Sequence, residues 1–118
     1  PPLEIDAELA LPEVDDASVL EVLSLGPFGY GNRAPVFAVL GAELVSPPTV
    51  LKDRHLRIEI RQQGRTLTLM AWDFRERPAE LQAGARIDFA IYFQEDTAAR
   101  RRGFRGWTAV VRDFRAVA

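Results

Sequence analysis

The segment from His55 to Trp72 alternates apolar and polar side chains on either side of a Gln63-Gly64 turn. A period of two is typical of paired strands, because successive side chains of a strand point to opposite faces. We therefore expect a β-hairpin with one face in a core. The inward set is predicted to be Leu56, Ile58, Ile60, Leu67, Leu69 and Ala71. The outward set is then His55, Arg57, Arg61, Thr66, Thr68, Met70 and Trp72.

Similar runs predict further strands at residues 36–45, 87–93 and 108–114, with a polar, basic loop at residues 94–106. Residues 3–11 also alternate and predict an N-terminal strand. A short helix is expected at residues 16–25, because Gly26 and Pro27 end it. Ser18 and Glu21 have the spacing of a capping box for that helix, and Asp16 is the alternative cap. A second short helix is predicted at residues 76–82.

Five strands in this order, with a small helix between the third and the fourth, are the element order of an OB-fold, a five-stranded Greek-key barrel. SH3-like barrels and irregular sandwiches produce similar patterns. We predict one mostly β domain, with the OB barrel in residues 36–118. Residues 1–35 are expected to form an N-terminal strand, a helix and a glycine-rich turn packed on it. The chain begins with Pro1 rather than Met, so we expect it to be a piece of a longer protein.

Positive charge is concentrated after residue 35. Residues 1–35 carry seven acidic side chains against Arg33 alone, so their net charge is −6. The whole chain has a net charge of −2, which leaves +4 for the remaining residues. Fourteen of the fifteen basic residues lie in that remainder, and thirteen of these are arginine. Such a composition suits phosphate partners, because the guanidinium group matches phosphate oxygens, but an ordinary solvated surface has the same composition.

Two regions are candidates for a strand-binding surface. The outward face of the hairpin offers Arg57, Arg61 and Trp72, and the second and third strands of OB-folds carry the usual binding site. Trp72 either stacks on bases or packs under a neighbouring segment such as the N-terminal strand. The basic loop offers arginines with an interleaved aromatic residue, a composition that favours a flexible single strand. Its candidate residues are Arg100, Arg101, Arg102, Phe104 and Arg105. Trp107, by its parity with Ala109 and Val111, is expected in the core.

The sequence has few residues suited to a metal site or a catalytic site. His55 is the only histidine, and we expect it to point outward from its strand, with a phosphate or base contact as the alternative. Asp15 and Asp16 precede the first helix, where carboxylates are expected as caps rather than metal ligands. The glycines of the Phe28-Gly29-Tyr30-Gly31 run are expected to allow a tight turn, with Phe28 packed beneath it. The absence of cysteine excludes disulfides and thiolate ligands. An independent enzyme is therefore not expected.

The segment from Leu25 to Phe37 reads Leu-Gly-Pro-Phe-Gly-Tyr-Gly-Asn-Arg-Ala-Pro-Val-Phe. It resembles a signature of RecJ-type single-strand-specific exonucleases, roughly Pro-Phe-Gly-x-Gly-Asn-Pro-x-Pro-x-Phe. Three further segments resemble the same family: Ile-Asp-Ala-Glu-Leu at 5–9, Lys-Asp-Arg-His-Leu at 52–56 and Arg-Asp-Phe-Arg at 112–115. The resemblance thus covers nearly the whole chain. Arg33 departs from it, since the family usually has proline there.

The resemblance implies the C-terminal OB domain of a RecJ-type enzyme that degrades single-stranded DNA from the 5′ end in repair and recombination. In that family a separate N-terminal region carries Asp-His-His motifs and two divalent metals, usually Mn²⁺ or Mg²⁺. This chain has none of those motifs, so we expect it to be non-catalytic alone and to need no cofactor itself. The OB domain of the family helps to hold the incoming strand.

The expected partners are therefore single-stranded DNA and the nuclease core of the same parent protein, in the cytoplasm. No apolar run approaches the ~18 residues of a membrane span, so no membrane partner is expected. The alternative is an OB domain for protein contacts, docking to its nuclease core or to a replication or repair partner. The acidic residues of segment 1–35 favour some such docking, because they would repel DNA.

Overall fold

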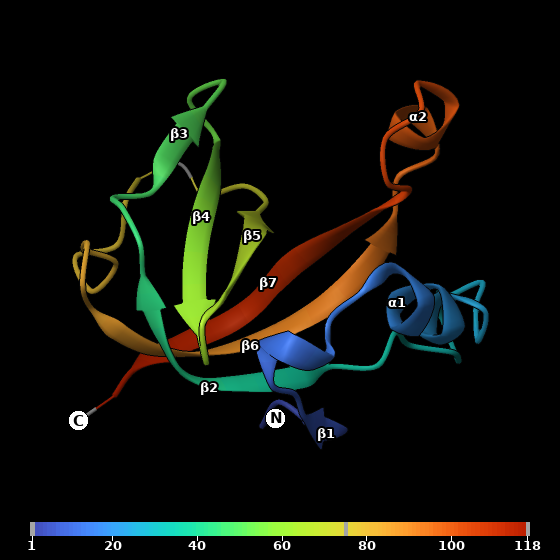
Figure 1. Ribbon diagram of the computed structural model, residues 1–118, viewed down its shortest axis with the longest axis horizontal. Helices are drawn as coiled ribbons and strands as arrows, with labels where there is room; N and C mark the ends of the chain where they lie inside the picture. Colours follow the sequence, from blue (N-terminus) through green and yellow to red (C-terminus); the bar gives the residue numbers. More distant parts are fainter. Residues whose placement is uncertain (1, 75, 118) are drawn as a thin grey trace.

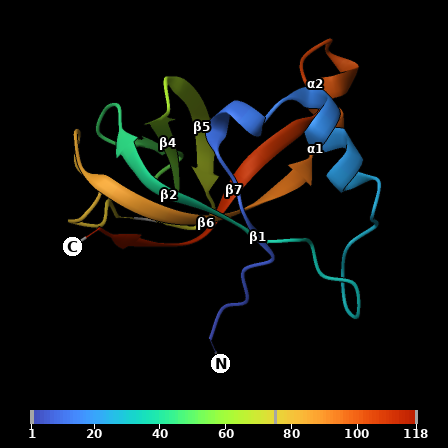
Figure 2. The same cartoon turned by 60° about the horizontal axis from the view of Figure 1, so that its bottom comes forward.

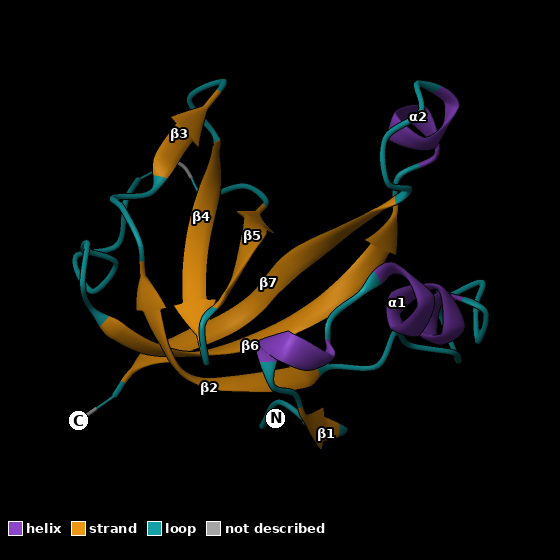
Figure 3. Ribbon diagram, in the orientation of Figure 1, coloured by secondary structure: helices purple, strands orange, loops and turns teal. Residues whose placement is uncertain are grey.

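The computed structural model describes residues 2–74 and 76–117 of the chain. Figures 1 and 3 show a curled sheet with small helical elements at its ends. The elements in chain order are β1 (Ala7–Glu8), the 3-10 turn η1 (Leu11–Glu13), α1 (Asp16–Leu23), β2 (Phe37–Leu44), β3 (Thr49–Leu51), β4 (His55–Gln62), β5 (Arg65–Ala71), β6 (Arg86–Glu95), α2 (Thr97–Arg101) and β7 (Trp107–Ala116).

The strands form a closed five-stranded barrel with two additions. Their order in the sheet is β1-β2-β6-β7-β5-β4-β3, and a further pairing of β2 with β4 closes the barrel. The pairing of β5 with β7 is parallel, whereas β4–β5 and β6–β7 are antiparallel. This is the strand arrangement of an OB-fold, so the predicted fold class is confirmed.

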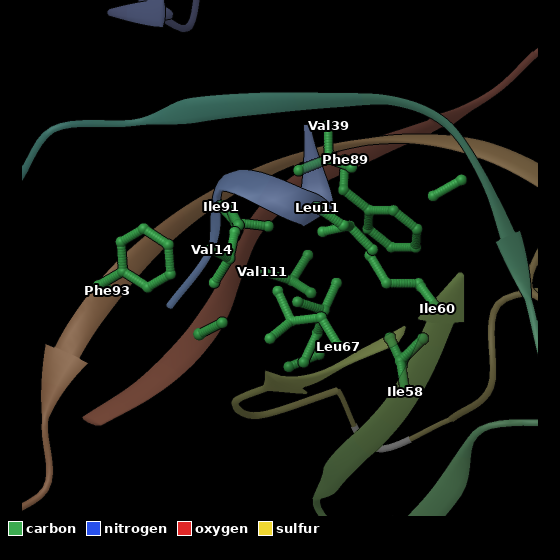
Figure 4. Packing of buried hydrophobic residues seen from close by; sticks show 14 of the residues in the cluster. Leu11, Val14, Val39, Ile58, Ile60, Leu67, Phe89, Ile91, Phe93 and Val111 are labelled. Atoms are coloured by element: carbon green, nitrogen blue, oxygen red, sulfur yellow. The ribbon is translucent and has the colours of Figure 1, made fainter. Parts of the chain in front are cut away.

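The core confirms the predicted parity of the β4–β5 hairpin. Its six inward residues are all buried, with exposed fractions of 0–6%. Figure 4 shows Ile58, Ile60 and Leu67 from this hairpin facing Phe89 and Val111 across the barrel. Leu11 and Val14 of the η1 region, with Val19 and Leu23 of α1, belong to the same buried cluster. The N-terminal segment therefore contributes directly to the core.

Closure of the barrel requires β2 to bend, and Gly41 lies at the bend. The register between β2 and β6 shifts between Val39 and Ala42, which marks a bulge. Gly41 has a φ of +61°, a conformation that side chains disfavour. Its N–H donates to Asp88 Oδ1 at 2.8 Å, and its carbonyl accepts from Arg86. Beyond the bulge, Glu43 and Leu44 pair with β4.

The predicted N-terminal strand is much shorter than expected. Only Ala7 and Glu8 are strand, pairing in parallel with β2, and the apolar residues Leu3 and Ile5 remain exposed. The cause is that this segment lies at the edge of the sheet (Figure 2), where no second layer of the described structure covers its apolar face. It is held instead through Asp6, which accepts from the Val36 N–H at 2.8 Å and pairs with Arg33 at 3.0 Å. The hydrogen bond from Val36, which is the larger cause, and the pairing with Arg33 both lower the pKa of the Asp6 carboxyl.

The predicted helix at residues 76–82 is wrong, because residues 76–85 are turns and loop (Figure 3). Only Leu81 is buried in residues 76–82, so the segment lacks the apolar stripe that stabilises a short helix in a protein. Conversely, the loop at residues 94–106 contains α2, and β3 adds an unpredicted edge strand. The cap of α1 is Asp15, one of the two carboxylates expected there, rather than Ser18 or Asp16: Asp15 accepts from the Ser18 N–H at 2.8 Å.

The glycine-rich turn forms as predicted. Gly29 and Asn32 make a small antiparallel bridge, and Gly31 has a φ of +83°. The Asn32 amide donates to the carbonyl of Pro27 at 2.9 Å, which closes the turn from inside. Phe28 is partly buried against the core cluster.

The role of Gly41 in closing the barrel predicts a conformational cost for any side chain there. Gly41→Ala is expected to lower the free energy of unfolding by about 1 kcal/mol, because a Cβ disfavours this left-handed backbone. An added Cβ would meet no atom within 4 Å, so steric overlap does not contribute. Urea denaturation of the parent and variant measures the difference.

Gly29→Ala is the matched control, since Gly29 also has open space around it and has no positive φ. Equal stabilities for Gly41→Ala and Gly29→Ala would contradict the role assigned to the bulge.

Candidate nucleic-acid interface

The outward face of the β4–β5 hairpin carries the first group of predicted residues. Arg57 is exposed and lies opposite Met70, and Arg61 lies opposite Thr66. Arg57 has no ion pair with any residue in 2–74 or 76–117, whereas Arg61 pairs with Glu43. The two arginines are four residues apart on one strand, roughly 13 Å. Arg57 is therefore the one with its charge available to a ligand.

Trp72 follows β5 directly and is 38% exposed. Its Nε1–H donates to Gln94 Oε1 at 3.3 Å, and its ring meets His55 edge-on with centroids 5.2 Å apart. His55 is in turn oriented by the Asp73 N–H, which donates to its Nδ1 at 2.9 Å. The indole is thus held in a fixed orientation on the surface. Stacking on a ring that is already oriented loses less conformational entropy than stacking on a mobile one.

The basic loop is built on α2, which projects from one end of the β6–β7 hairpin (Figure 1). Asp96 caps the helix by accepting from the Ala99 N–H at 3.0 Å. Arg100 lies against Gly106, so closely that a Cβ there would be 2.6 Å from its Nε. Arg101 and Arg102 are exposed and make no ion pair within the described part of the chain. Phe104 is 67% exposed.

Arg105 and Trp107 anchor the base of this loop to α1. Trp107 is buried as predicted, and its Nε1–H donates to Asp16 Oδ1 at 2.8 Å. The Arg105 guanidinium lies 3.8 Å from the centroid of the Trp107 ring, a cation–π contact. Partial burial lowers the pKa of Arg105, and nearby Asp16 acts in the opposite direction. Arg105 is thus held at the base of the loop, and Asp16 serves as an anchor rather than as a cap.

The structure joins the two predicted regions at one place. Gln94, the partner of Trp72, is two residues before Asp96, so the indole lies at the foot of the basic loop. In Figure 1 the tip of the β3–β4 hairpin and α2 rise on either side of β5 and β7. Arg61 is at the opposite end of β4 from His55 and Trp72 and is not part of this grouping. Sequence reasoning missed Gln94, although its alternation with Phe93 marked it as outward-facing.

Within residues 2–74 and 76–117, no group of three histidine, aspartate or glutamate side chains is placed to hold a metal ion. No helix in the described structure has the length and apolar character needed to span a bilayer.

Comparison with known proteins supports both the OB-fold and the resemblance to RecJ-type enzymes. The family model described as the RecJ OB domain matches residues 5–105, from the segment before β1 to the basic loop. No curated protein matches the chain. The matched region includes the glycine-rich turn, the β4–β5 hairpin, Trp72 and α2. The chain therefore belongs to the RecJ OB domain family.

Proposed function

We propose that this OB domain binds single-stranded DNA for a RecJ-type exonuclease that degrades single strands from the 5′ end in repair and recombination. The observation that carries the proposal is the oriented, partly exposed indole of Trp72 at the foot of a loop with four arginines. Bases stack on such aromatic surfaces with little sequence preference, while arginines neutralise the phosphates. The chain itself supplies no step of hydrolysis, and Mn²⁺ or Mg²⁺ would belong to the nuclease core of the parent protein.

The eight predicted residues divide into different roles within this proposal. Arg57, Arg101 and Arg102 have free guanidinium groups and make phosphate contacts, whereas Trp72 and Phe104 stack on bases. Arg100 and Arg105 maintain the shape of the loop through Gly106 and Trp107. Arg61 neutralises Glu43 and contributes little to a ligand.

Docking to a protein is the second candidate, and a different surface favours it. Leu20 of α1 and Leu25 are exposed, and Tyr30 at the tip of the glycine-rich turn is fully exposed. These exposed apolar side chains belong to the acidic segment 1–35, which would repel DNA. The nuclease core of the parent protein is the partner proposed for it, and such docking is compatible with DNA on the other surface.

Removing the two free loop arginines is expected to weaken binding and reduce its salt dependence. For Arg101→Gln with Arg102→Gln, the slope of log K against log salt should fall by ~0.7 for each phosphate that is no longer neutralised. Fluorescence anisotropy of labelled oligo-dT at several salt concentrations measures both quantities. Arg65→Gln with Arg115→Gln makes the same change in net charge away from the loop and should leave the slope unchanged. Equal slopes for both double variants would contradict the role of the loop.

Trp72→Leu is expected to weaken binding of oligo-dT without changing the salt slope. Stacking on an aromatic side chain contributes about 1–3 kcal/mol per base, and the arginines that neutralise phosphates are all retained. Affinity should therefore fall about 5- to 150-fold. Circular dichroism and the urea midpoint serve as controls for folding. A folded Trp72→Leu variant that binds as tightly as the parent chain would remove Trp72 from the site.

A further inference from the structure

A row of side chains crosses the outer face of the barrel next to Trp72. Arg57 of β4 pairs with Met70 of β5, Met70 pairs with Val110 of β7, and Val110 pairs with Tyr92 of β6. Partners on neighbouring strands point to the same face, so these four residues form one line across four strands. With strands about 4.8 Å apart, the line is about 14 Å long. It runs across the strands, whereas the two hairpin arginines lie along one strand.

The outer face at this row is covered rather than open. Val110 is only 1% exposed, yet it does not belong to the core cluster inside the barrel. The hydrogen bond from Trp72 to Gln94 explains part of the burial of Val110. Trp72 follows β5 and Gln94 is on β6, and β7, which carries Val110, lies between these two strands in the sheet. To reach Gln94, the indole must cross the outer face of β7. Tyr92 is two residues from Gln94 on the same strand and face, so the aromatic surface continues from Trp72 towards Tyr92.

Arg112 lies next to this surface with its charge free. It follows Val110 by two residues on β7 and sits where the register with β6 shifts, between the pairs Ile91–Val111 and Ala90–Asp113. Its side chain is exposed and has no ion-pair partner in the part of the chain that the structure describes. Tyr92 and Arg112 both line a cleft of about 690 Å³, which residues 2–4, Arg33 and Asp113 also line. Arg33 is already paired with Glu4 and Asp6.

We propose that single-stranded nucleic acid crosses the sheet along this row, with Tyr92 as a second stacking position and Arg112 as a further phosphate contact. The strand would pass from Arg57 over Trp72 to Tyr92, where Arg112 lies beside it. This inference rests on the proposed function and extends the site beyond the hairpin and the loop. Arg61, about four residues from the row along β4 and neutralised by Glu43, lies off the path.

Titration of labelled oligo-dT of about 12 nucleotides at several salt concentrations tests the path. Tyr92→Leu should weaken binding about 5- to 150-fold with an unchanged salt slope, as expected for one stacked base. Tyr92→Phe keeps the ring and should bind as the parent chain does, which separates stacking from packing. Arg112→Gln should lower the slope by ~0.7, while Arg61→Gln, its matched control on another strand, should leave the slope unchanged.

The outcomes distinguish this inference from the function on which it rests. If the parent chain does not bind oligo-dT even at low salt, both the proposed function and this path are wrong. If Trp72→Leu weakens binding but Tyr92→Leu and Arg112→Gln bind as the parent does, the path is wrong and the proposed function stands. Should Tyr92→Leu fail to fold, the salt slope of Arg112→Gln against Arg61→Gln decides, and equal slopes overturn the path.

Discussion

Closure of the barrel depends on two junctions that each consist of only two residue pairs. β2 meets β4 through Glu43–Arg61 and Leu44–Ile60, and β5 meets β7 through Leu69–Ala109 and Met70–Val110. Few backbone hydrogen bonds hold such short junctions, so side-chain packing on both faces must contribute to them. Inside, Ala109 and Leu69 are completely buried in the core. Outside, Val110 is buried beneath the surface that carries Trp72. The candidate binding face is therefore also the outer side of a closing junction, which fixes its shape.

The end of the β6–β7 hairpin connects this face to the N-terminal segment. On its inner side, Trp107 packs against Phe93 with ring centroids 5.6 Å apart and donates to Asp16 of α1. On its outer side, Gln94 holds the Trp72 indole. The basic loop lies between these two anchors in the sequence, and Arg105 stacks on Trp107 at its base. A flexible arginine-rich loop loses conformational entropy when it binds, whereas a loop anchored on both sides has already lost part of it. In the proposed complex with single-stranded DNA, the anchors would thus favour affinity without adding contacts to the ligand.

The parts that the sequence predicted well are those where a local pattern determines the structure. Alternation in residues 55–72 was sufficient for the parity of both strands, and the parity of Ala109 and Val111 placed Trp107 in the core. The failures have a common physical cause. Residues 3–11 alternate but lie at a sheet edge, and residues 76–82 have helical propensity but only Leu81 to bury, so tertiary context decided both. The pairing of Arg61 with Glu43 and the row from Arg57 to Tyr92 depend on strand register, which no local pattern contains.

The proposed single strand lies on the outer face of the β5–β7 junction, between the basic loop and Tyr92. Its position can be measured by titrating the ¹⁵N-labelled chain with oligo-dT and following the amide and indole NMR signals. A strand on this face should shift the indole N–H of Trp72 and the amides of Tyr92, Gln94 and residues 97–106 most. The buried indole of Trp107, bonded to Asp16, should shift less than that of Trp72. Shifts confined to α1 and the turn at residues 27–34, with the Trp72 indole unmoved, would contradict this position of the strand.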